Sequence, residues 1–254
     1  MNKLVCCLGL AAFLTGCGEW AGVNESKKIV GGEPAPRGQY PFFAAIVKED
    51  GSHLCGAALI APRWVLTAEH CIDGQAPHSV SIGLEQYRPT VVEKDRVRIQ
   101  ATYGHPQFDH SGRYDIALIK LERAANSTDF LEFDGAESVM EPGVGYPVRL
   151  IGFGRTETGY GPDVLYQGLG ETLEDKACIE VPPGYPATHF DPLVNLCAGY
   201  NQASGDSGGP LLYKSGSHYL EIGLVSRSLW MNAGQYTRVA HFAGWITKTM
   251  EDNQ

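Results

Sequence analysis

Three short segments of the chain carry side chains that together could break an acyl bond. They are Leu66–Cys71, Arg113–Leu121 and Gly205–Pro210. The third segment holds Ser207 among glycines, which let the backbone bend sharply so that a hydroxyl and nearby amides face a substrate together. A serine hydroxyl is a weak nucleophile that needs a base, and a neutral histidine can remove its proton near pH 7. His70 in the first segment is the candidate for that base.

Asp115 supplies the third group of such a site. It directly precedes an apolar run, where burial of a carboxylate is costly unless a positive or hydrogen-bonding group meets it. Beside a histidine, this carboxylate would fix the tautomer and stabilise the imidazolium. Taken singly, the three segments also fit a structural histidine, an aspartate in a turn and a glycine-rich turn. Taken together, they predict nucleophilic hydrolysis by Ser207, His70 and Asp115.

The elements that must position these residues read as short strands. Apolar runs separated by turn residues occur at Phe42–Val47, Ala57–Ile60, Ser79–Gly83, Val97–Ile99, Ile116–Leu121, Val148–Phe153, Leu220–Ser226 and Gln235–Val239. With 31 glycines and 15 prolines, this pattern favours an all-β barrel or sandwich. A helix is predicted only at the end, where apolar residues recur at steps of three and four: Val239, Phe242, Ile246 and Met250.

Composition excludes some classes of protein. Of the 254 residues, 43% are hydrophobic and 19% are charged, so the chain can bury a core and is not disordered as a whole. The formal net charge is -9, the opposite of the basic bias that a nucleic-acid-binding surface needs. We therefore expect no nucleic-acid partner.

The N-terminus has the features of an export signal. Lys3 precedes an apolar run, Leu4–Leu14, which is too short to span a bilayer. The following Leu-Thr-Gly-Cys sequence resembles the lipobox of bacterial lipoproteins, which implies a signal peptide over residues 1–16 and a lipid on Cys17. A plain secretory signal that ends near a cysteine is the alternative. Residues 17–28 are polar and aperiodic, as in a flexible tether.

The seven cysteines divide accordingly. Two leave with the signal and Cys17 carries lipid, so four remain: Cys55, Cys71, Cys178 and Cys197. An even number in an exported chain predicts disulfides, and four cysteines allow three pairings, of which local pairing is the simplest. None has the spacing of a metal or redox motif, and we expect no metal and no cofactor. Glu85 and Glu93 lack a convincing calcium-ligand pattern.

Four motifs in the same order and spacing resemble those of the chymotrypsin-like (trypsin-fold, S1-type) serine peptidases. They are Ile29–Gly32, Leu66–Cys71, Asp115–Leu118 and Gly205–Pro210, and the resemblance extends from Ile29 to about Met250. It implies a peptidase domain over residues 29–254 made of two six-stranded antiparallel Greek-key barrels, roughly 29–135 and 136–254, with the triad between them. The G-x-S-x-G pattern also occurs in α/β-hydrolases, but their chain order is serine, acid, histidine. A catalytically inactive relative that only binds partners is the other alternative.

The resemblance assigns further roles. The amides of Gly205 and Ser207 would form the oxyanion hole. Cys55 would pair with Cys71, and Cys178 with Cys197. Glu69 is a departure from the family, since alanine is common at its position.

Activation in the family follows cleavage before the isoleucine of the first motif. The new amine of Ile29 would pair with Asp206, and Lys28 would precede the cut bond, which implies a separate activating protease. Because Cys17 lies before this bond, we expect cleavage to release a membrane-anchored lipoprotein into the periplasm or the extracellular space.

Specificity is where the sequence departs most from the family. The position that holds an aspartate in trypsin-like members is Asn201, so no acidic residue is available to recognise lysine or arginine. We expect an uncharged or aromatic substrate side chain, with acidic substrates a weaker alternative because of Arg227. Gly234 would leave the pocket open on one side. The predicted substrate-binding residues are Asn201, Ser204, Ser226, Arg227, Ser228 and Gly234.

Overall fold

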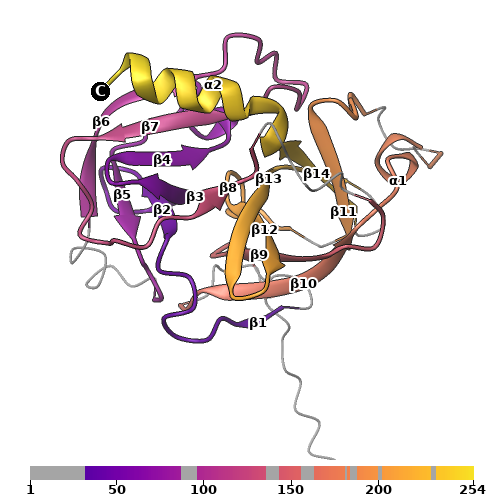
Figure 1. Cartoon of the computed structure of the whole chain (residues 1–254), viewed down its shortest axis with the longest axis horizontal. Helices are drawn as coiled ribbons and strands as arrows, with labels where there is room; N and C mark the ends of the chain where they lie inside the picture. The colour runs from indigo at the N-terminus through magenta and orange to yellow at the C-terminus, as the bar shows by residue number, and fades with distance from the viewer. Residues whose placement is uncertain are drawn as a thin grey trace, which may run out of the picture.

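The computed structural model describes residues 32–86, 96–135, 143–155, 163–180, 182–183, 188–199, 202–229 and 233–254. Two antiparallel barrels lie beside each other, and the C-terminal helix lies along one side of the molecule (Figure 1). Strands dominate, as the spacing of apolar runs predicts, and the fold class is confirmed.

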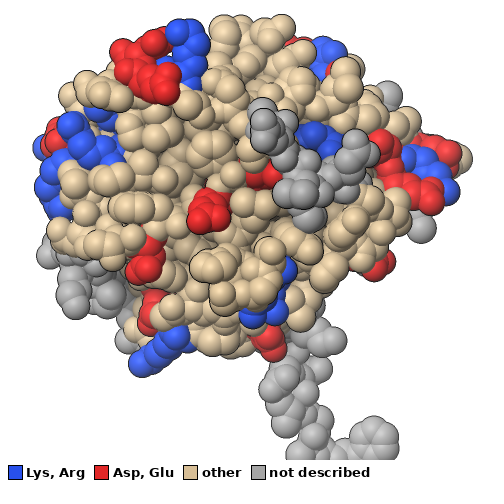
Figure 2. Space-filling model, in the orientation of Figure 1, with Lys and Arg blue, Asp and Glu red and all other residues tan. Residues whose placement is uncertain are grey.

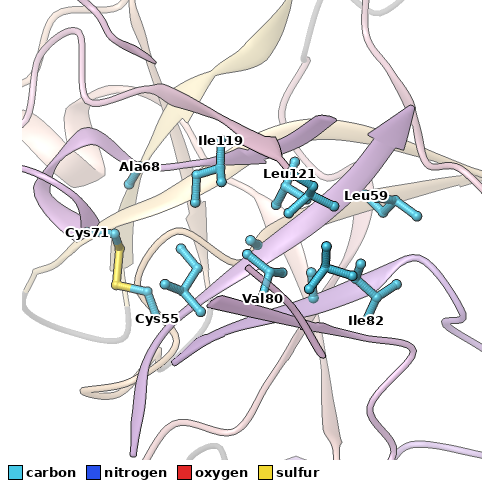
Figure 3. Close-up of a cluster of buried hydrophobic side chains, with 13 residues drawn as sticks. Cys55, Leu59, Ala68, Cys71, Val80, Ile82, Ile119 and Leu121 are labelled. Atoms are coloured by element: carbon cyan, nitrogen blue, oxygen red, sulfur yellow. A yellow bond between two sulfur atoms is a disulfide. The ribbon is translucent and has the colours of Figure 1, made fainter. Parts of the chain in front are cut away.

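The first barrel closes through six strands in the order β2-β3-β4-β7-β6-β5, with β5 pairing back onto β2. Its strands are β2 (Phe43–Val47), β3 (His53–Ala61), β4 (Trp64–Thr67), β5 (Ser79–Ile82), β6 (Arg96–Gly104) and β7 (Ala117–Leu121). Aliphatic side chains from these strands fill the barrel, and one disulfide lies at the edge of this core (Figure 3). His70 follows β4 and Asp115 precedes β7, so both catalytic candidates are attached to strands of this closed barrel.

The second barrel closes through six strands because β9 pairs with both β10 and β12. Its strands are β9 (Pro147–Gly152), β10 (Tyr166–Thr172), β11 (Asn195–Gly199), β12 (Pro210–Ser215), β13 (His218–Ser228) and β14 (Ala233–Arg238). Two short strands join it at the margins: β1 (Glu33–Pro34) pairs with β10, and β8 (Glu132–Phe133) pairs with β13. The turn before β12 carries Ser207.

Helices are few in the part of the chain that the structure describes. A 3₁₀ turn, η1, covers Glu69–Cys71, and α1 covers Lys176–Ile179. The terminal helix α2 runs from Val239 to Asp252, which confirms the predicted helix. Its apolar face packs onto residues of both barrels in one cluster: Ile60, Trp64, Leu66, Ile116, Leu118, Val194 and Leu224. The helix therefore bridges the two barrels.

The described residues contain two disulfides. Cys55 is bonded to Cys71 within the first barrel, and Cys178 is bonded to Cys197 within the second. This is the pairing that the family resemblance implied. On the face shown in Figure 2, acidic and basic side chains occur in small separate groups across a mostly uncharged surface.

Candidate active site

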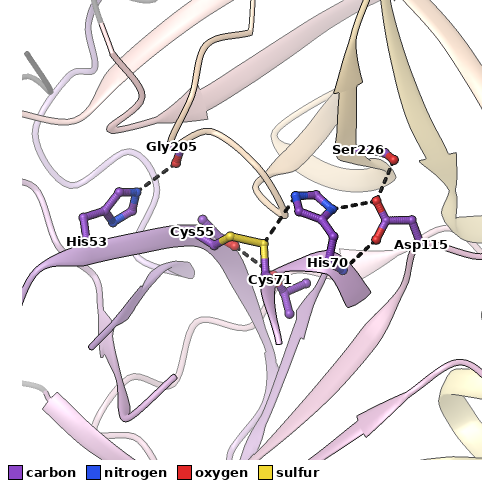
Figure 4. Close-up of a disulfide and its surroundings, with 9 residues drawn as sticks. His53, Cys55, His70, Cys71, Asp115, Gly205 and Ser226 are labelled. Carbon is purple, nitrogen blue, oxygen red and sulfur yellow. Dashed lines mark hydrogen bonds and ion pairs between the residues drawn. A yellow bond between two sulfur atoms is a disulfide. The ribbon is translucent and has the colours of Figure 1, made fainter. Parts of the chain in front are cut away.

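His70 and Asp115 are held together at the edge of the first barrel. His70 is the middle residue of η1, directly after β4, and Asp115 lies two residues before β7. The Nδ1 atom of His70 lies 2.7 Å from Oδ2 of Asp115, and the backbone N–H of His70 donates to Oδ1 at 2.9 Å (Figure 4). The two contacts fix both the ring and the backbone of the histidine against one carboxylate.

Asp115 is buried, with 2% of its surface exposed, and its surroundings favour the charged form. The Ser226 hydroxyl donates to Oδ2 at 2.6 Å. Burial alone would raise the pKa of Asp115, but hydrogen bonds from His70 and Ser226 and the charge of His70 outweigh it and keep the pKa below its usual value. An ionised carboxylate that accepts the Nδ1 proton leaves Nε2 as the nitrogen available for acid–base chemistry.

Ser207 comes from the second barrel, on a turn that touches the first. Its carbonyl accepts a hydrogen bond from the Gly56 N–H at 2.8 Å. The next residue, Gly208, has φ +72°, and a Cβ there would lie 2.2 Å from Oγ1 of Thr67. Glycine is required here both for the backbone conformation and for the close approach of the barrels.

In the described part of the chain, no hydrogen bond joins the Ser207 hydroxyl to His70. Among the described residues, the Ser207 side chain makes no hydrogen bond, and Nε2 of His70 lies 3.8 Å from Sγ of Cys71 (Figure 4). Catalytic hydrogen bonds are often long without substrate and shorten when it binds.

A histidine outside the predicted site residues, His53, bonds to the backbone beside the predicted oxyanion hole. Nε2 of His53 lies 2.8 Å from the carbonyl of Gly205, which has φ +103° (Figure 4). Burial lowers the pKa of His53 against the opposing effect of this hydrogen bond, so the ring is neutral and donates from Nε2. The contact fixes the Gly205 peptide. The one sequence signal for His53 is its place two residues before Cys55.

Asp206 occupies a closed pocket formed by glycines. Its carboxylate accepts hydrogen bonds from the N–H groups of Gly154, at 2.8 Å, and Ala203, at 2.9 Å. A Cβ on Gly152 or Gly154 would lie 2.2 or 2.3 Å from its carboxylate oxygens. Burial raises the pKa of Asp206 to about 6, although both hydrogen bonds lower it. Nothing cationic among the described residues balances this group.

Three of the predicted substrate-binding residues, Arg227, Ser228 and Gly234, contact a residue outside the predicted set, Gln202. Its Oε1 would be 2.2 Å from a Cβ on Gly234, so Gln202 fills the space that Gly234 was expected to leave open. The amide donates to the Arg227 carbonyl at 2.7 Å and accepts from the Tyr236 hydroxyl at 2.9 Å. Ser228 donates to the Gln202 carbonyl. The Gln202 side chain is thus held by polar contacts and carries no charge.

The other specificity residues differ in their placement. The guanidinium of Arg227 is exposed and donates to the carbonyl of His110 at 2.9 Å. Ser226 uses its hydroxyl on Asp115, as described above, and Ser204 is exposed. Asn201 lies outside the described residues.

Metal-binding groups are few in the part of the chain described by the structure. The single cluster with suitable spacing is Cys55, His70 and Cys71. The two cysteines of this cluster are bonded to each other in a disulfide, so they offer no thiolate to a metal ion. Glu85 accepts a hydrogen bond from the Gly38 N–H, and Glu93 lies outside the described residues.

The predicted activation and anchoring residues Cys17, Lys28 and Ile29 also lie outside the described residues. Within the described ranges, no helix has the length and apolar character needed to cross a membrane.

Comparison with known proteins gives two results. The family model described as Trypsin matches residues 29–246. Among solved structures, the chain is similar to VesC, a secreted serine protease from Vibrio cholerae, with 26% identity and a TM-score of 0.75. The match covers 86% of this chain but only 48% of that one, so this chain spans about half the length of the solved protein.

Proposed function

Because the chain belongs to the trypsin family, we propose that it is a serine endopeptidase that hydrolyses peptide bonds through an acyl-enzyme on Ser207. The observation that carries this proposal is the buried Asp115 carboxylate, bonded to Nδ1 of His70 at 2.7 Å, opposite the Ser207 turn of the second barrel. An imidazole that is paired with a carboxylate and oriented by it is the group that activates a serine hydroxyl as a nucleophile.

The proposed chemistry proceeds in two halves. Nε2 of His70 accepts the Ser207 proton as Oγ bonds to the substrate carbonyl carbon, and the resulting oxyanion accepts hydrogen bonds from the amides of Gly205 and Ser207. Asp115 stabilises the imidazolium, which then protonates the leaving amine as the peptide C–N bond breaks. A water molecule repeats the sequence on the ester, which releases the acid and restores Ser207.

A fluorophosphonate probe tests this function directly, since it phosphonylates only an activated serine. We expect the protein cut after Lys28 to be labelled at Ser207 and to hydrolyse casein, with both signals lost after heat unfolding. A processed, folded protein that is neither labelled nor active would support the alternative of a protease-like binding protein.

The specificity pocket is proposed to accept an uncharged side chain. This rests on Gln202, a neutral side chain in contact with Gly234, and on the absence of any described acidic residue in that group of contacts. The Arg227 guanidinium already donates a hydrogen bond to the His110 carbonyl, which weakens the alternative of acidic substrates. Profiling the processed protein with a peptide library should show cleavage after uncharged or aromatic residues. Cleavage mainly after lysine or arginine would contradict the proposal and would allow self-activation at Lys28.

Membrane release on activation is proposed from the disulfide pattern. Neither disulfide joins residues 1–28 to the rest of the chain, so a cut after Lys28 leaves no covalent link to a lipid on Cys17. In fractionated cells, the uncut chain should be found with membranes and the cut chain in the soluble fraction. A Cys17→Ser variant should be soluble in both forms. Retention of the cut chain in the membrane fraction would show that the anchor lies elsewhere.

A further inference from the structure

Glu69 lies directly beside the proposed base in the sequence and is held in a site of its own. It is the first residue of η1, and its side chain packs against Gly104 at the end of β6. A Cβ on residue 104 would lie 2.1 Å from both carboxylate oxygens. Gly104 does not have a positive φ, so its backbone does not require glycine. The missing side chain at 104 instead provides the room in which the Glu69 carboxyl sits.

The surroundings of Glu69 are poorly suited to a permanent charge. Its Oε2 atom is buried and has no hydrogen-bond partner. Burial, together with the charges of Asp73 and Asp115, raises the pKa of Glu69 to about 7, and His70 acts in the opposite direction. Its charge therefore appears as the pH rises through the neutral range, in which a catalytic histidine must lose its proton to act as a base.

Other titratable groups near this site are already directed elsewhere. Asp73, in the loop after η1, lies 3.4 Å from Nε2 of His110. His105, which follows Gly104, stacks on Tyr114 and contacts Trp245 of α2. Three charged groups act on Glu69: the carboxylates of Asp73 and Asp115, and the imidazole of His70. Of these, only the imidazole is stabilised by a negative charge on Glu69.

We propose that Glu69 is a positioning residue of the peptidase site that acts through His70: seated on Gly104, its carboxylate stabilises the imidazolium that forms when Ser207 gives up its proton. In this role Glu69 needs no contact with the substrate or with the reacting atoms. Its effect is electrostatic and reciprocal, because a carboxylate that is stabilised by an imidazolium stabilises that imidazolium equally. The inference rests on the proposed function, since it requires His70 to be the base.

The test is the pH dependence of kcat/KM for Glu69→Gln, which keeps the shape of the side chain and removes its charge. We expect the midpoint of the acid limb to move to lower pH by about half a unit to one unit, because the imidazolium loses its nearby anion. The limb should also become steeper, since in the wild type two coupled groups titrate together. Glu122→Gln is the matched control: Glu122 is exposed, the net charge changes equally, and its profile should overlay the wild type.

A second readout does not depend on turnover. In the inactive Ser207→Ala background, the His70 imidazole resonance, assigned by its loss in a His70→Ala variant, should titrate with a lower midpoint when Glu69 is replaced by glutamine. A Glu69→Asp variant, which restores the charge on a shorter side chain, should recover part of the shift.

The outcomes separate the two proposals. If the processed wild type has no Ser207-dependent activity, the proposed function fails. If the wild type is active but Glu69→Gln changes neither the acid limb nor the His70 titration, the role of Glu69 is refuted and the function stands. A loss of activity at all pH values with an unchanged midpoint would also refute it, since that result indicates only a structural role.

Discussion

Replacing Ser207 with alanine should lower kcat/KM of the processed protein by roughly 10⁴–10⁶ while leaving the fold intact. The side chain is partly exposed and makes no hydrogen bond to another described residue, so little packing is lost. The carbonyl that contacts Gly56 belongs to the backbone and is kept. The loss should therefore fall on kcat, with KM and the thermal unfolding temperature close to those of the wild type.

The size of the effect distinguishes nucleophilic catalysis from other roles of this turn. Ser215→Ala is the control, since Ser215 is an exposed serine at the end of β12. Its kinetics should match those of the wild type. If Ser207→Ala kept more than about a hundredth of wild-type activity, another nucleophile or a contaminating enzyme would have to account for the hydrolysis.

Asp206→Asn should lower the activity of the protein cleaved after Lys28 but stabilise the uncut protein. In the processed protein it should lower kcat/KM by roughly 10²–10³. The Ile29 ammonium would lose its buried charged partner, and the proposed Ile29–Asp206 pair could no longer hold the substrate pocket in its active shape. In the uncut chain, the same substitution should stabilise the fold at about pH 8 and leave it unchanged at about pH 4.

The sign for the uncut chain follows from the raised pKa of Asp206, which burial brings to about 6. The folded protein then binds this proton more tightly than the unfolded chain does, so stability falls as the pH rises from about 4 through about 6. The loss amounts to roughly 3 kcal/mol when the group is fully ionised. Asparagine resembles the protonated carboxyl and avoids this loss.

Thermal unfolding of both forms at the two pH values, with activity of the processed form, checks this prediction. Asp129→Asn is a suitable control, because Asp129 is an exposed aspartate far from the pocket in sequence. If the processed Asp206→Asn variant were fully active, the Ile29–Asp206 pair would have no part in activation.

The features that could be predicted from the sequence are those encoded by neighbours in the chain. The motifs around His70, Asp115 and Ser207 are local, and so is the period of apolar residues that gives α2. Strand ends were less predictable: β6 extends to Gly104, well beyond the apolar run Val97–Ile99, because its later residues alternate between half-buried and exposed and form no apolar run. The strands β10, β11 and β12 have glycines or charged residues within them and gave no clear apolar run.

The finer properties of the site depend on contacts between residues distant in sequence. Glu69 is notable in the sequence as a departure from the family. The space that its carboxyl occupies exists only because residue 104, which lies against it in the folded barrel, is a glycine. In the same way, Gln202 replaces open space beside Gly234, and the burial of Asp206 depends on Gly152. No local pattern reports which glycine faces which side chain, so these pairs required the structure.

The bridging position of α2 bears on how the two halves of the site keep their spacing. His70 and Asp115 belong to one barrel and Ser207 to the other, while each disulfide stays within a single barrel. The helix starts from β14, packs across both barrels, and at its end the Lys120 ammonium donates to the carbonyl of Asn253. Among the described residues, α2 therefore links the two barrels by packing, where neither disulfide links them. Removing the last turn of α2 would abolish the contact between Lys120 and Asn253, and with it one link between the first barrel and the C-terminus.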